Sequence, residues 1–359
     1  MSAALPSSRL TIADVARELG VSRATVSMAF SGKGTITPRL REEVLQGARE
    51  LGYEPNPLAQ RLRGRATNTV AFYSPALDPG PTVFKMQHIQ TLLNRAGFEV
   101  QLHARPYEPN SNGEPEKLLR CVRLEKPRAI VCNAGWHFGA SEAAQLAAFE
   151  AEGGVVGCLS YKEPLPCAFD QVVFGGAHEV KLAVEHLSNL GHRRLGLVAH
   201  DLDDARASLE RDRFCQEARR LGLEVRGEWL LGVAGQYSGS LGERAAAMFL
   251  ALRERPSAII AGPESVAAAF LHHLMRAGVQ VPRDLSLVAL GDAGEAARHA
   301  AVAITAVSDP FADHGETLVH LLLERLSGSY AGEPRTRWVQ GQWIERESTA
   351  KFSGSGTRR

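Results

Sequence analysis

The chain has 359 residues, of which 44% are hydrophobic, 23% charged and 6% aromatic. This length and composition exclude a disordered, collagen-like or small disulfide-stapled protein, and they predict two or three domains with buried cores. The net charge of +1 neither favours nor excludes a polyanionic partner. No apolar run is long enough to span a membrane and residues 1–9 show no signal-peptide pattern, so we expect a cytoplasmic protein without a membrane partner.

The sequence contains no GxSxG, HExxH, Walker or CxxC pattern. Its cysteines are odd in number and widely spaced, which predicts reduced, mostly buried thiols rather than disulfides; they are Cys121, Cys132, Cys158, Cys167 and Cys215. His272 and His273 are neighbours in a helical pattern and so point to different faces. We therefore expect no catalytic residue, no metal and no cofactor.

Charge is distributed unevenly along the chain. The first 66 residues carry ten basic and six acidic residues, a net charge of +4, which leaves 31 basic and 34 acidic residues, or −3, for the remainder. A small basic head on a slightly acidic body is a common layout of nucleic-acid binders. An excess of four charges is equally compatible with an ordinary solvated surface.

The basic head reads as three short helices. The first begins after Thr11 and ends at Gly20, and the second begins after Ser22. In the second helix Val26, Ala29 and Phe30 face inward, and the outward residues are Arg23, Ala24, Ser27 and Met28. Because the two helices are joined by a tight glycine-containing turn, they predict a helix-turn-helix whose second helix enters a DNA major groove. A third helix runs from the Thr37-Pro38 cap to Gly52.

A fragment of about two helical turns follows, with Asn56 as its cap, Pro57 at its first position and Gly64 as its stop. A helix so far below the length of about 12–15 residues needed for marginal stability in water forms only when something packs against it. We therefore expect this segment to order on binding a partner.

From residue 69 onward, apolar strands alternate with amphipathic helices, which predicts parallel sheets covered on both faces. The expected strands are 70–73, 99–103, 129–132, 155–159, 172–174, 195–199, 258–261, 285–290 and 304–307. The expected helices are 84–96, 142–152, 180–190, 205–221, 245–255, 266–277 and 313–326. This length exceeds that of one ordinary sheet domain, so we expect two lobes with a cleft between them.

The first 63 residues contain four short motifs that follow one another along the chain. They are Thr11-Ile12-Ala13-Asp14-Val15-Ala16, Val21-Ser22 with Thr25-Val26-Ser27, Leu51-Gly52-Tyr53-Glu54-Pro55-Asn56, and Ala59-Gln60-Arg61-Leu62. This region resembles the DNA-binding head and hinge of the LacI/GalR family of bacterial transcription regulators. The resemblance extends into the body at residues 182–187, 190–194, 281–286 and 346–350.

The resemblance implies a multi-domain protein with an all-α helix-turn-helix head at 9–54 and a hinge helix and linker at 55–66. A two-lobed α/β sensor and dimerisation domain of periplasmic-binding-protein-like fold, with parallel sheets, follows at 67–348, and a flexible tail at 349–359. It implies a homodimer that binds a pseudo-palindromic operator in double-stranded DNA, acting as a repressor in the nucleoid under control of a small-molecule effector of unknown identity. Residues 351–359 are Gly/Ser-rich and lack an apolar heptad, so we expect no tetramerising helix.

By this resemblance, Arg23, Ala24 and Met28 contact base edges of the operator. An arginine that donates two hydrogen bonds to guanine contributes about 1–3 kcal/mol of discrimination. The residues that match phosphate-contacting positions are Thr11, Ser22, Thr25, Ser27 and Ser31, for whose hydroxyls the capping of helix starts is the alternative role.

In the hinge, Asn56, Ala59 and Leu62 match the residues that family members place in the minor groove. There an apolar wedge such as Leu62 unstacks a base step and kinks the duplex. The alternative is that Leu62 docks onto the body of the protein.

Candidate effector-binding residues lie near the carboxyl ends of the predicted strands, where open parallel sheets bind ligands: Tyr73, Phe84, Trp136, Tyr161, Glu210, Tyr237, Glu264 and Asp292. For each aromatic residue, packing is the alternative role. Relatives commonly have an arginine where Glu210 stands and aspartates where Gly175 and Gly291 stand, and those side chains bind sugar hydroxyls.

These departures argue against a typical sugar effector and leave several alternatives open. Glu210 favours a cationic ligand, Asp292 could replace the missing aspartate by a shift of one residue, or the sensor responds to another non-sugar ligand or to a protein partner. A DNA-binding enzyme or recombinase is the alternative of another class, but no nucleophile with an accompanying acidic set is found.

Overall fold

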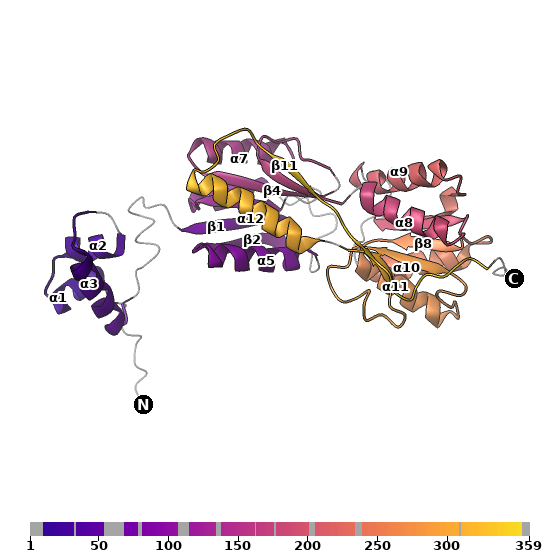
Figure 1. Cartoon of the computed structure of the whole chain (residues 1–359), viewed down its shortest axis with the longest axis horizontal. Coiled ribbons are helices and arrows are strands. Elements are labelled where there is room, and N and C mark those ends of the chain that lie inside the picture. Colours follow the sequence, from indigo (N-terminus) through magenta and orange to yellow (C-terminus); the bar gives the residue numbers. More distant parts are fainter. Residues whose placement is uncertain are drawn as a thin grey trace, which may run out of the picture. The chain divides into compact units, whose positions relative to one another are not determined.

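The computed structural model describes residues 10–31, 34–53, 68–77, 81–106, 115–133, 138–161, 163–175, 177–200, 205–233, 239–308 and 310–353. The chain divides into two compact units, Met1–Thr67 and Asn68–Arg359, drawn in Figure 1. The predicted hinge helix at 55–66 lies outside the described residues. The predicted fold class is confirmed: an all-α helix-turn-helix head and a two-lobed α/β domain with parallel sheets.

The head consists of α1 (Ile12–Glu18), α2 (Arg23–Ser31) and α3 (Pro38–Glu50). The predicted inward residues of α2, Val26 and Ala29, join Val15, Val44 and Ala48 in one buried cluster. The turn between α1 and α2 needs the left-handed conformation of Gly20, whose φ is +64°. Local sequence signals therefore suffice to arrange these three helices.

The first lobe, here called the N-lobe, contains a six-stranded sheet in the order β11-β5-β4-β3-β1-β2, whose neighbours are all parallel. Its strands are β1 (Thr69–Leu77), β2 (Glu99–Pro106), β3 (Ala129–Asn133), β4 (Val155–Tyr161), β5 (Asp170–Phe174) and β11 (Thr336–Val339). One face is covered by α5 (Pro81–Arg95) and α12 (Phe311–Ser327), the other by α6 (Pro115–Leu124) and α7 (Ala140–Ala151).

The second lobe, here called the C-lobe, contains a six-stranded sheet in the order β12-β10-β9-β8-β6-β7. Its strands are β6 (Leu195–His200), β7 (Leu230–Val233), β8 (Ala258–Ala261), β9 (Ser286–Leu290), β10 (Thr305–Val307) and β12 (Trp343–Ile344). The helices α8 (Ala177–Asn189) and α9 (Ala205–Arg220) cover one face, and α10 (Gly239–Ala251) and α11 (Glu264–Arg276) cover the other (Figure 1).

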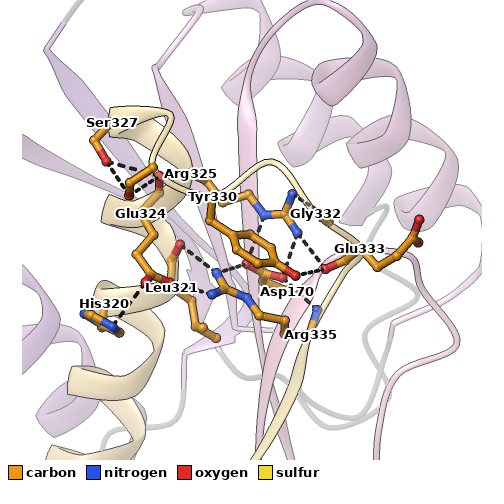
Figure 2. A network of polar contacts seen from close by, with 11 residues as sticks. Asp170, His320, Leu321, Glu324, Arg325, Ser327, Tyr330, Gly332, Glu333 and Arg335 are labelled. Carbon is orange, nitrogen blue, oxygen red and sulfur yellow. Dashed lines mark hydrogen bonds and ion pairs between the residues drawn. The ribbon is translucent and has the colours of Figure 1, made fainter.

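Some elements differ from the sequence-based expectation. The strands β7, β11 and β12 were not predicted, because they have only two to four residues; β11 is mostly exposed. The helix α6 was not predicted either, although Leu119 and Val122 pack into the core at helical spacing. β12 pairs antiparallel with β10, so the second sheet is not purely parallel. The strand β11 is held against β5 by a polar network around Asp170, which Figure 2 shows.

The prediction of a flexible tail from residue 349 is wrong for its first residues. Backbone hydrogen bonds join Leu287 N to Ser348 O at 2.8 Å and Phe352 N to Leu190 O at 2.8 Å, and Ala350 N donates to Ser286 Oγ at 3.1 Å. The described part of the tail, up to Ser353, therefore lies against the C-lobe, because its backbone groups find partners there. Among the described residues, no helix is both long and apolar enough to span a membrane.

Candidate DNA-binding surface and effector site

The first turn of α2 presents an arginine that has no partner among the residues the structure describes. Arg23 and its neighbour Ala24 are exposed, and no hydrogen bond or ion pair joins the Arg23 guanidinium to the described part of the chain. Other arginines of the head are engaged: Arg17 pairs with Asp14 at 2.8 Å, Arg39 pairs with Glu43 at 2.9 Å, and Arg41 donates to Ala29 O at 3.2 Å. All the donors of Arg23 thus remain available to a ligand.

The hydroxyls at the starts of the first two helices act as caps. Thr11 forms a capping box with Asp14, whose pKa is lowered by hydrogen bonds from the Thr11 side chain and backbone and by the Arg17 charge. Ser22 Oγ accepts from Thr25 N at 3.0 Å and lies 2.8 Å from Thr25 Oγ1. The capping alternative therefore holds for these residues in the free protein, and their contacts with phosphate stay a prediction.

Met28 is only partly exposed and packs on a glycine of the turn that leads to α3. A methyl group placed on Gly34, whose φ is +98°, would come within 2.5 Å of Met28 Sδ. Met28 thus supports the turn, and its base contact stays a prediction, as does the phosphate contact of the partly exposed Ser27. The side chain of Ser31 and the hinge residues Asn56, Ala59 and Leu62 lie outside what the structure describes.

In the N-lobe, a set of rings joins the carboxyl ends of β4 and β5 to the first turns of α5 and α12. The centroids of Phe84 and Phe311 lie 5.8 Å apart, those of Tyr161 and Phe174 5.5 Å apart, and those of Phe174 and His314 6.1 Å apart. Two of the predicted effector residues, Phe84 and Tyr161, are therefore brought to the same end of the lobe.

The C-lobe meets this ring cluster at the loop that follows β9. A methyl group placed on Gly294 would come within 3.6 Å of the Phe84 ring and 2.7 Å of Glu264 Oε1. Glu264 is 7% exposed and accepts hydrogen bonds from the backbone N–H groups of Gly294 and Ala297. Burial, followed by the Asp292 charge, raises the pKa of the Glu264 carboxyl. Phe84 and Glu264 thus both flank Gly294, where the two lobes meet.

The other acidic candidates lie nearby, but one is already paired. Asp292 accepts two hydrogen bonds from Arg346, at 2.9 and 2.7 Å, so its charge is compensated within the C-lobe. Glu210 Oε1 would lie 3.7 Å from a methyl group on Gly262, next to Leu290 at the ends of β8 and β9. Asp292 is therefore a poor replacement for the missing ligand-binding aspartate.

Two basic residues of the N-lobe were missed by sequence reasoning. Lys85 is 8% exposed, and no hydrogen bond or ion pair joins its ammonium to any described residue. His314 is 1% exposed; its Nε2–H donates to Val172 O at 2.9 Å, while its Nδ1 has no hydrogen-bond partner. Burial, together with the Lys85 charge, lowers the pKa of His314 to about 3. The sequence could have revealed Lys85, because it is spaced by four residues from Ile89 and by eight from Leu93, which lie on the core-facing side of α5.

The remaining effector candidates are not placed at this site. Tyr73 is fully buried in the core of the N-lobe, so its role there is packing, the alternative to effector binding. Trp136 and Tyr237 lie outside the described residues. Within the described part of the chain, no group of three or more His, Cys, Asp and Glu residues is arranged to hold a metal ion.

Comparisons with known proteins match both units of the chain. A family model described as "Bacterial regulatory proteins, lacI family" matches residues 11–56, and one described as "Periplasmic binding protein-like domain" matches residues 184–349. The NTD biosynthesis operon regulator NtdR of Bacillus subtilis (strain 168) is 24% identical over 340 residues, which span 94% of this chain and 99% of the relative. The chain belongs to the LacI family of bacterial regulatory proteins. It is accordingly a DNA-binding transcriptional regulator with an effector-binding sensor domain, and not an enzyme.

Two further LacI-family matches span almost the whole chain. The transcriptional repressor PurR of Erwinia tasmaniensis is 24% identical over 351 residues, covering 95% of this chain and 97% of that repressor. Among solved structures, the Lac repressor dimer bound to operator and the anti-inducer ONPF has a TM-score of 0.78 at 21% identity, and the match covers 96% of this chain and 100% of that one. The LacI fold therefore extends from the head through both lobes.

Proposed function

We propose that this LacI-family regulator acts as a repressor in the bacterial cytoplasm, bound to the nucleoid as a homodimer on a pseudo-palindromic operator. An effector in the inter-lobe site would change the relative orientation of the lobes and so the stability of the DNA-bound state. Support comes from the family membership and from the similarity to a Lac repressor that is dimeric and operator-bound. The proposal that α2 reads DNA bases is supported by Arg23 on the exposed first turn of α2, whose guanidinium has no partner in the described part of the chain.

Replacing Arg23 tests direct base readout. Because a bidentate contact with guanine contributes about 1–3 kcal/mol of discrimination, Arg23→Ala should relax the preference at one base pair in each half-site. The measurement is the binding of the full-length chain to a library of operator half-site variants. Arg39→Ala is the matched control, because Arg39 is exposed on another helix and pairs with Glu43. A loss that is uniform across all sequences would assign Arg23 to a phosphate instead.

Replacing Leu62 tests the minor-groove wedge assigned to the hinge residues Asn56, Ala59 and Leu62. Leu62→Ala should weaken operator binding strongly, since the extra contacts that follow DNA kinking would be lost. Thermal unfolding of the sensor should stay unchanged, because the substitution lies in the hinge segment. Unchanged operator affinity would favour docking of Leu62 on the body of the protein.

The effector is proposed to be something other than a neutral sugar. Gly175 and Gly291 carry no side chain where family members bind hydroxyls, and Asp292 is already paired with Arg346. A thermal-shift screen with sugars, nucleobases, amines and phosphorylated metabolites tests this, because a ligand that binds only the folded state raises its melting temperature. A sensor that none of these compounds stabilises would point to control by a protein partner.

A further inference from the structure

We propose that the N-lobe half of the effector site is an anion site, in which the Lys85 ammonium binds a carboxylate or phosphate group of the effector between the N-termini of α5 and α12. This inference rests on the proposed function of the sensor and names the chemical class of its ligand. It is carried by the burial of Lys85, by the placement of two helix ends and by the absence of a counter-ion in the described part of the lobe.

The burial of Lys85 is the first step. A lysine that is 8% exposed has lost most of its hydration, and a buried charge without a partner costs several kcal/mol unless a counter-ion or water stays beside it. The stripe that Lys85 shares with Ile89 and Leu93 would accept a leucine or methionine, both of which avoid this cost. Binding of an anionic ligand would explain why a charged residue occupies this buried position.

The acidic residues that the structure describes near the start of α12, Asp313 and Glu316, do not neutralise this ammonium. Glu316, one turn beyond the start of α12, has its carboxylate 3.3 Å from His88 Nε2. Asp313 is exposed, and no ion pair joins it to Lys85. His314 is the neighbour whose pKa responds to the Lys85 charge, and it stays neutral near pH 7 because that pKa is about 3. Lys85 therefore contributes one positive charge, and no carboxylate among the described residues pairs with it.

The two helix N-termini add to this potential. The contact between Phe84 and Phe311, with ring centroids 5.8 Å apart, brings the first turn of α5 next to the first residue of α12. The first turn of α5 contains no acidic residue, whereas that of α12 contains the exposed Asp313; the N-cap of α12, Pro310, provides no side-chain hydrogen bond. Unpaired N–H groups at a helix start attract anions. Thr82, 7% exposed on the same turn as Lys85, adds a hydroxyl donor.

The opposite wall has the complementary polarity. A methyl group on Gly294 would lie 2.7 Å from Glu264 Oε1 and 3.6 Å from the Phe84 ring, so this carboxylate lies on the C-lobe side of the contact between the lobes. A ligand that spans the site would thus place its anionic group toward Lys85 and its hydroxyl or amine donors toward the C-lobe. A sugar acid and a sugar phosphate both fit this description, whereas the corresponding neutral sugar lacks the group that Lys85 would bind.

Thermal unfolding of the full-length chain with matched probes tests the proposal. Gluconate carries a carboxylate, glucose 6-phosphate carries a phosphate and glucose is neutral, so the three probes distinguish the two anionic groups from an uncharged sugar. They are compared at equal ionic strength, adjusted with sodium chloride. We expect at least one anionic probe to raise the melting temperature by about 3 °C or more, a shift typical of a ligand near saturation, and glucose to have no such effect. The proposal is overturned if the two anions shift the wild-type chain no more than glucose does.

Lys85→Met supplies the decisive variant, and Lys181→Met on the exposed surface of α8 is its control. The Lys85 variant should melt at or above the temperature of the ligand-free wild type, because an uncompensated buried charge is removed. Its half-saturating concentration of the active anion should rise about tenfold or more, as expected from the loss of a charge-assisted hydrogen bond. A lower melting temperature, or an unchanged response to the anion, would show that Lys85 is structural.

Operator binding separates this inference from the proposed function. If the wild-type chain binds no operator but its anion response depends on Lys85, the proposed repressor function fails and the anion site stands.

Discussion

Two basic side chains without partners among the described residues mark the two proposed sites, and their surroundings differ. Arg23 is exposed, and water solvates its charge at no cost until DNA replaces that water. Lys85 is buried, so the absence of a partner is unfavourable in the ligand-free protein. An unpaired arginine on a surface is compatible with many roles, whereas an unpaired lysine in an apolar stripe calls for a counter-ion.

At Gly242, a missing side chain allows two helices to approach closely. A methyl group there would come within 2.7 Å of both Ala269 Cβ and Phe270 N on α11. Gly242→Ala should therefore destabilise the chain by about 1–3 kcal/mol, because the strain of backbone overlap exceeds the gain of about 1 kcal/mol in helix propensity. Denaturant unfolding of the full-length chain measures this.

The control for Gly242 is Glu243→Ala on the exposed side of the same helix, which should change stability by less than about 0.5 kcal/mol. A Gly242 variant that is more stable than the wild type would show that α10 and α11 can separate at little cost.

At the scale of elements, a polar network fastens the edge strand β11 and the end of α12 to β5. Asp170 accepts from Arg325 at 3.0 Å and from Arg335 at 2.8 Å, and the guanidinium carbons of these arginines lie 4.9 and 3.7 Å from the Tyr330 ring centroid (Figure 2). Glu324 accepts a further hydrogen bond from Arg335. A four-residue strand with mostly exposed side chains gains little from hydrophobic burial, so these polar contacts stabilise its position.

The stability of this network should depend on pH. Burial alone would raise the pKa of Asp170, but hydrogen bonds from Arg325 and Arg335 outweigh burial and lower it. Since the pKa is lower in the folded state than the unfolded value of about 3.9, the stabilisation is present above pH 4 and is lost as the pH falls through the lowered pKa. Asp170→Asn should cost about 3–5 kcal/mol at pH 7, because it leaves two arginines without their carboxylate.

Urea unfolding at pH 7 and in acid measures this change. The gap in unfolding free energy between the wild type and Asp170→Asn should narrow as the pH falls below 4. Asp212→Asn is the control, because Asp212 is largely exposed and its ion pair with Arg211 is on the surface. A gap that stays constant with pH would mean that the charge of Asp170 contributes nothing and that only its shape matters.

At the scale of the whole molecule, the positive charge is concentrated in the first 66 residues, with a net charge of +4 against −3 for the remainder. Operator binding should therefore be strongly salt-dependent. If the two heads of a dimer neutralise about six to ten phosphates, affinity should fall by about 10³–10⁵ between 50 and 200 mM salt. Titrations of a labelled operator at several salt concentrations measure the slope. An affinity that is independent of salt would exclude this mode of DNA binding.

Much of the fold follows from local signals. The caps at Thr11, Ser22 and Thr37 and the positive φ of Gly20 define the head, and strand–helix alternation predicts parallel sheets. The strands β7, β11 and β12 have only two to four residues, too few for a pattern to reveal them, whereas the missed helix α6 does carry apolar residues at helical spacing. The five cysteines are free, as expected, but Cys121 is exposed, whereas Cys132 and Cys158 are register neighbours in the N-lobe sheet.

The sequence by itself determined the family, the helix-turn-helix and the alternating architecture, because these depend on motifs and periodicities within short stretches of chain. Tertiary structure alone decided which polar groups are paired. Asp292 is neutralised by Arg346, and the Lys85 charge helps to lower the pKa of His314, only because distant segments pack together. Whether a charge is available to a ligand depends on those distant neighbours and on its burial, and neither is encoded in local spacing.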